Sequence, residues 1–124
     1  NRFLAPQSMM AEINAAVGKT LDTASLVRTV YDSLALSYKL AVDELEANTG
    51  ERYNTINIIG GGSRDGLLNE LTAAATGKII VTGPVEATAT GNIAMQMISA
   101  GEIKDIVSAR NIIKNSFDIK EVQA

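Results

Sequence analysis

The chain has 124 residues and a net charge of −3, with 46% hydrophobic but only 4% aromatic residues. This length allows one domain with a modest aliphatic core, and the acidic charge argues against nucleic acid as a partner. The absence of cysteine and histidine excludes disulfides, thiolate metal sites and the commonest general base. The apolar runs are too short for a membrane span, and the first residues do not resemble a signal peptide. We therefore expect a soluble cytoplasmic domain with no membrane partner.

The first half of the sequence predicts two helices. A short helix is expected from Pro6 to about Val17, followed by the connector "GKTLD". Thr23 is a plausible N-cap for a long helix that ends near Gly50. Tyr31 and Tyr38 fall on this long helix, and we expect both rings to pack in the core with hydrogen-bonded hydroxyls.

The second half has the pattern of an α/β protein. The segments "TINIIG" (55–60) and "KIIVTG" (78–83) predict strands, with a helix between them from about 64 to 75. A strand, a helix and a second strand at this spacing predict a parallel βαβ unit. Two further helices are expected near 87–100 and 108–115.

Two strands are too few for this set of helices. A parallel sheet needs more strands and cover on both faces, so we expect the chain to be a piece of a larger α/β protein. The strands that complete the sheet would then lie outside these residues.

The three glycines at 60–62 follow the first predicted strand, where a phosphate-binding loop could stand. The P-loop motif G-x-x-x-x-G-K-[ST] has its glycine spacing at Gly61 and Gly66. However, Leu67 and Leu68 occupy the places of the lysine and of the hydroxyl that binds magnesium. A P-loop is therefore excluded.

Two other interpretations of the glycines remain open. The dinucleotide fingerprint G-x-G-x-x-G fits Gly60 and Gly62, and Glu86 lies at the right distance for the ribose acid. Asp65 replaces the third glycine, however, and its charge would repel a pyrophosphate at the helix N-terminus. The glycines could also serve only a tight turn between strand and helix.

Longer motifs carry a family resemblance. The segments "NIIGGGSRDGLLNELTA" and "GPVEATATGNIAMQ" resemble the C-terminal part of the FGGY carbohydrate kinases, as do "RFLAPQSM" and "VYDSLALSYKLAVDEL" upstream. The resemblance implies a partial actin-like ATPase (ribonuclease H-like) lobe, with residues 1–124 a fragment of the second, C-terminal lobe. The parent would use ATP and Mg²⁺ to phosphorylate a ketose, with L-rhamnulose expected ahead of fuculose or xylulose, and the N-terminal lobe would be this chain's missing partner.

The resemblance also implies a nucleotide site at the glycines. Gly61, Gly62 and Ser63 would line the adenosine part of the nucleotide, and Asp65 stands where the family usually has asparagine. A carboxylate there only accepts hydrogen bonds, whereas an amide also donates. Asn69 is a further candidate.

No residue of this chain matches the catalytic base or the metal ligands of the family, so we expect the chain alone to be inactive. We interpret Glu86 as an acid near Thr88 at a helix start, where the helix dipole favours it. Gly91 would let that helix pack close to the sheet. The alternatives from other classes are a non-catalytic nucleotide-binding or structural interaction module, and a Rossmann-type dinucleotide-binding piece.

Overall fold

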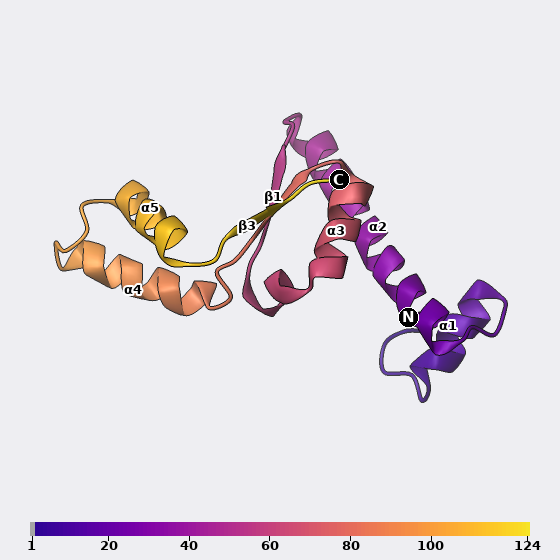
Figure 1. Cartoon of the computed structure of the whole chain (residues 1–124). Helices are drawn as coiled ribbons and strands as arrows, with labels where there is room; N and C mark the ends of the chain where they lie inside the picture. Colours follow the sequence, from indigo (N-terminus) through magenta and orange to yellow (C-terminus); the bar gives the residue numbers. More distant parts are fainter. Residues whose placement is uncertain (1) are drawn as a thin grey trace.

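The computed structural model describes residues 2–124. These residues form an elongated molecule, with a three-stranded sheet between two helical ends (Figure 1). In chain order the elements are α1 (Met9–Val17), α2 (Thr23–Thr49), β1 (Thr55–Ile58), the 3-10 helix η1 (Gly60–Arg64), α3 (Gly66–Thr76), β2 (Ile79–Thr82), α4 (Ala87–Ser99), α5 (Ile106–Ser116) and β3 (Lys120–Val122).

The helices begin at polar caps and mostly end at glycines. Helix α1 begins later than predicted, because the side chain of Ser8 caps it by accepting from the backbone N–H of Ala11. The N-cap of α2 is Asp22, not Thr23, since the Asp22 carboxylate accepts from the N–H of Ser25 at 2.8 Å. Gly50 ends α2 in the left-handed conformation, as the sequence predicted.

The predicted parallel βαβ unit is confirmed. Strands β1 and β2 pair in parallel, with Thr55 opposite Ile79, and α3 connects them. Helices α2 and α3 run side by side next to the sheet (Figure 1). Ala35 of α2, Ala73 of α3 and Ile80 of β2 are buried. Helix α2 packs on α3, and α3 in turn contacts β2 and β3.

The sequence interpretation missed the third strand. Residues Lys120–Val122 form β3, which pairs antiparallel with β2 and places Val122 opposite Ile80. Two of its three residues are charged, so the segment has no apolar alternation to signal a strand. The expectation of only two strands was therefore wrong, because pairing with β2 creates the third.

Helices α4 and α5 form a hairpin between β2 and β3 that extends away from the sheet (Figure 1). Ala94, Ile103 and Ala109 are the buried residues that hold it together. The expectation that Gly91 brings α4 close to the sheet is wrong, since a Cβ built on Gly91 meets no atom within 4 Å. Helix α4 packs on α5 instead.

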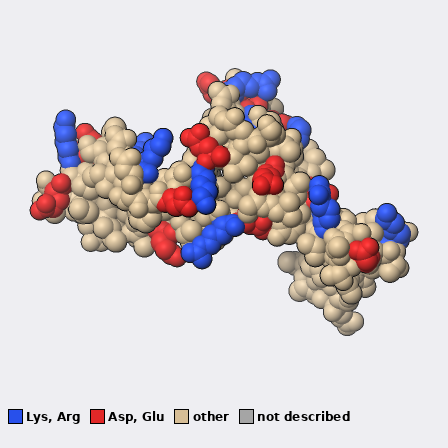
Figure 2. Space-filling view, viewed as in Figure 1, with Lys and Arg blue, Asp and Glu red and all other residues tan. Residues whose placement is uncertain are grey.

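Opposite charges are interspersed over the visible face of the molecule, with no broad patch of one sign (Figure 2). Within residues 2–124, no helix combines the length and the apolar character that a membrane crossing requires.

Candidate functional site

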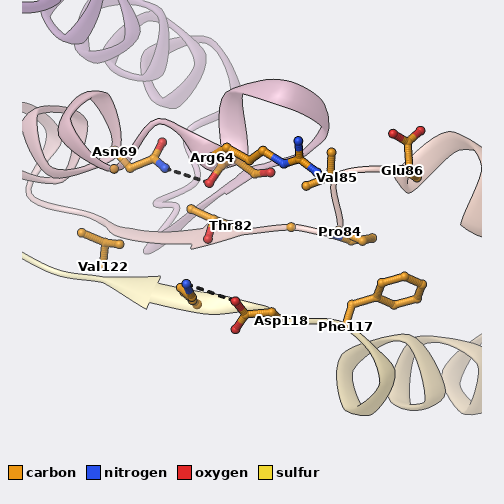
Figure 3. A pocket seen from close by; sticks show the side chains of 13 residues that line it. Arg64, Asn69, Thr82, Pro84, Val85, Glu86, Phe117, Asp118 and Val122 are labelled. Carbon is orange, nitrogen blue, oxygen red and sulfur yellow. Dashed lines mark hydrogen bonds and ion pairs between the residues drawn. The ribbon is translucent and has the colours of Figure 1, made fainter.

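A cleft of about 540 Å³ lies beyond the carboxyl ends of the parallel strands β1 and β2. Open α/β sheets commonly bind ligands at this edge. Three segments form its walls: the end of the glycine turn with the start of α3, the loop after β2, and the segment that leads into β3 (Figure 3). The lining residues are Ser63, Arg64, Gly66, Asn69, Thr82, Gly83, Pro84, Val85, Glu86, Phe117, Asp118, Lys120 and Val122.

The backbone conformation requires glycine at only some of the three positions 60–62 in η1. Gly60 has a φ of 73°, a left-handed conformation that other residues adopt only with strain. Gly61 and Gly62 are outside that region. A Cβ on Gly61 would meet nothing within 4 Å, and one on Gly62 would make an ordinary contact of 3.6 Å with Ile58. The fold therefore requires glycine at position 60 but not at 61 or 62.

Of the four residues predicted to contact the nucleotide, Ser63 lines the cleft, whereas Gly61, Gly62 and Asp65 are not among its lining residues. The hydroxyl of Ser63 donates to the carbonyl oxygen of Gly60 at 2.6 Å. Its own carbonyl accepts from Asn69 Nδ2 at 3.3 Å, the dashed line beside Asn69 in Figure 3. Asn69 is only 2% exposed, and within the described residues its Oδ1 has no hydrogen-bond partner. Ser63 and Asn69 thus fix the turn from the side of the cleft.

Asp65 does not line the cleft. Its Oδ1 accepts from the backbone N–H of Leu68 at 3.1 Å and caps α3. Its Oδ2 accepts from the hydroxyl of Tyr31 on α2 at 2.7 Å. This hydrogen bond and the nearby charge raise the pKa of Tyr31. Sequence reasoning predicted a hydrogen-bonded Tyr31 hydroxyl but not its partner, because the two residues are 34 positions apart.

The charges around the cleft are mixed. Arg64 and Lys120 face the same cleft as Glu86 and Asp118, and Lys120 pairs with Asp118 at 3.0 Å. The expected place of Glu86 at a helix start is confirmed, since it is the N-cap residue of α4, although its side chain makes no capping hydrogen bond. Asp65 faces Tyr31 and does not line the cleft, so the structure does not bring Asp65 and Glu86 together as an acid–base pair.

Arg64, Thr82, Asp118 and Lys120 are cleft residues that the sequence interpretation missed. The charged residues carried no motif, and the last two reach the cleft only because β3 joins the sheet. Across residues 2–124, no group of three or more acidic side chains is arranged to hold a metal ion. The cleft offers hydrogen-bond donors, mixed charge and apolar walls from Pro84, Val85 and Phe117, a combination that suits the binding of a small ligand.

The chain is therefore an α/β domain with a strand, a glycine turn and a helix beside a cleft, an arrangement at which open α/β sheets commonly bind ligands. The chain belongs to the FGGY family of carbohydrate kinases: residues 1–100 match the C-terminal domain of that family. The resemblance seen in the sequence motifs is thereby confirmed.

Three relatives specify the similarity further. The chain is 45% identical over 124 residues to a rhamnulokinase of Bacillus subtilis, a match that covers 96% of this chain and 26% of the relative. It is 42% identical to a rhamnulokinase of Enterococcus faecalis, over 99% of this chain and 26% of the relative. It is 43% identical to a rhamnulokinase of Halalkalibacterium halodurans, over 96% of this chain and 27% of the relative. The chain thus spans about a quarter of the length of the curated relatives it matches.

Proposed function

We propose that residues 1–124 are the nucleotide-binding portion of the second lobe of an ATP-dependent sugar kinase with an actin-like (ribonuclease H-like) fold. The parent would transfer the γ-phosphoryl group of ATP to L-rhamnulose, with Mg²⁺ neutralising the phosphates. Membership of the FGGY carbohydrate kinases and the 40–45% identity to proteins named rhamnulokinase support the proposal.

The observation that carries the nucleotide site is the pair of glycines that the fold does not require. Gly61 and Gly62 have ordinary backbone angles and room for a side chain. Glycine at such positions costs conformational entropy without a return within the chain. A purine or ribose that packs directly on the backbone of Gly61 and Gly62 would explain these glycines, because a side chain there would prevent such close contact.

The neighbouring candidates have different roles in this proposal. Ser63 shares the turn and lines the cleft, which supports a direct contact between Ser63 and the nucleotide in this proposal. Asp65 is the fourth predicted residue, and both of its carboxylate oxygens are engaged by Leu68 and Tyr31. We therefore assign Asp65 an influence on the nucleotide through the shape of the turn.

Phosphoryl transfer also needs a base, a metal cradle and a held acceptor in one place. In the proposal these come from the rest of the parent, with the sugar held by its N-terminal lobe. The isolated chain would therefore bind nucleotide weakly and perform no transfer.

Chemical-shift mapping of the ¹⁵N-labelled chain tests the proposal. ADP should shift the backbone amides of Gly61, Gly62 and Ser63, and NAD should shift them no more than ADP does, because the site would recognise only the adenosine that both molecules contain. Shifts caused by NAD but not by ADP would favour a Rossmann-type piece. No shift with either nucleotide, with a folded spectrum, would favour a structural module and overturn the nucleotide site.

A further inference from the structure

One hydrogen bond joins the long helix α2 to the end of the glycine turn. The hydroxyl of Tyr31 donates to Asp65 Oδ2 at 2.7 Å. Tyr31 is half-buried, and its partner lies between η1 and α3. The contact therefore connects α2 to the residue at which the proposed nucleotide turn passes into α3.

Asp65 is the residue that fixes how the turn ends. Its backbone N–H donates to the carbonyl of Gly62 at 3.2 Å, and its carbonyl accepts from the N–H of Asn69 at 3.0 Å. Its Oδ1 holds the N–H of Leu68. Gly61 and Gly62 have no side chains to hold the turn themselves. Ser63 and Asn69 hold the turn from the side of the cleft, and Asp65 holds its end on the side of α2.

Tyr31 is well suited to hold it. Hydrogen bonds to an ionised group are shorter and stronger than those between neutral groups, and the pKa of Tyr31 is raised because its hydroxyl donates to the Asp65 carboxylate. The neutral phenol is therefore kept as the donor. Tyr38 lies seven residues further along α2, is 39% exposed, and has no hydrogen bond from its hydroxyl within the described residues.

We propose that Tyr31 is a positioning residue for nucleotide recognition: through Asp65 it holds the Gly61–Ser63 turn in the conformation that the ligand contacts. This inference rests on the proposed function, since the turn must be a nucleotide site for its conformation to matter to binding. Tyr31 itself does not touch the nucleotide. Its effect reaches the ligand only through the backbone of the turn.

The first experiment needs no ligand. Tyr31→Phe removes the hydroxyl and keeps the ring, and Tyr38→Phe is the matched control on the same helix. Tyr31→Phe should move the amide shifts of Gly61, Gly62 and Ser63 and lower their ¹⁵N order parameters, while Ile80 in β2 stays unchanged. Tyr38→Phe should change neither set. Unchanged turn amides in Tyr31→Phe would overturn the inference, whether or not the chain binds nucleotide.

The second experiment is an ADP titration of the same variants. Tyr31→Phe should weaken ADP binding about threefold to tenfold, which is less than the full loss of a hydrogen bond to a charged group because the effect reaches the ligand only through the backbone of the turn. Tyr38→Phe should leave ADP binding unchanged. Asp65→Asn should retain affinity alongside Tyr31, because its amide can donate to the Tyr31 oxygen while its Oδ1 accepts from Leu68. The double variant Tyr31→Phe/Asp65→Asn should lose ADP affinity, because the hydroxyl partner of the amide is then absent.

The two proposals fail in different ways. If the unmodified chain takes up no ADP, the proposed function fails, and the ligand-free amide spectra alone decide whether Tyr31 holds the turn. If the unmodified chain binds ADP and Tyr31→Phe binds it equally well, the proposed function stands and the positioning role is overturned.

Discussion

Replacing Gly61 by alanine separates a glycine that serves a ligand from one that serves the fold. The new methyl group would enter open space on a residue with an ordinary φ. Such a replacement stabilises a protein by about 0.4–1 kcal/mol, because it restricts the unfolded chain. Gly60→Ala is the matched control. At a φ of 73°, with its nearest neighbour 3.9 Å away, it should cost about 1–2 kcal/mol from backbone strain alone.

Nucleotide affinity should respond in the opposite sense to stability. If a purine or ribose packs on the bare Cα of Gly61, the methyl group of Gly61→Ala displaces it. ADP binding should then weaken at least about tenfold, or about 1.4 kcal/mol. Urea unfolding followed by far-UV circular dichroism measures the stability of each variant, and an ADP titration observed through the amide of Ser63 measures the affinity.

Two results would refute this reasoning. A Gly61→Ala variant that binds ADP as tightly as the unmodified chain would show that the nucleotide does not lie on this residue. A Gly61→Ala variant as destabilised as Gly60→Ala would show that the backbone itself requires glycine at position 61, and the argument from unexplained glycines would lose its basis.

Three further predictions concern stability and activity. Glu46 is buried and paired with Lys78 at 2.6 Å, and mainly this hydrogen bond lowers the pKa of Glu46 from 4.5 to about 2. The ionised Glu46 contributes fully to stability above pH 4.5, and this contribution is lost as the pH falls toward 2. The melting temperature should therefore drop across this pH window, and it should drop less in Glu46→Gln. Gly83→Ala should destabilise the chain by about 2 kcal/mol in urea unfolding, since φ at Gly83 is 100° and the new Cβ would lie 3.2 Å from the carbonyl of Asp118. Gly91→Ala in α4, where the new Cβ meets no atom, should stabilise the chain by up to about 1 kcal/mol. The same change in unfolding free energy for both variants would contradict this prediction. The purified chain should not phosphorylate L-rhamnulose above background with saturating Mg²⁺ and ATP in a coupled assay, and turnover that a substitution in this chain abolishes would overturn the prediction.

The sequence by itself determined the features that depend on neighbouring residues. Caps and stops such as Gly50 and Gly77 set the ends of α2 and α3, and the order of strand, helix and strand was enough to predict the parallel pairing of β1 with β2. The long sequence motifs indicated the FGGY family, and the match of residues 1–100 to its C-terminal domain confirms this. Each of these signals lies in one continuous stretch, where backbone geometry and hydrophobic spacing act locally.

Only the tertiary structure decided the features that join distant segments. A charged three-residue segment becomes β3 because β2 offers it unpaired backbone groups, and that pairing brings Asp118 and Lys120 to the cleft. The apolar face of α4 packs on α5 and not on the sheet. Asp65 turns toward Tyr31 because α2 passes beside α3. Hydrogen bonds and packing between residues far apart in the chain leave no periodic trace in either segment, so the sequence predicted the glycine turn but not what holds it.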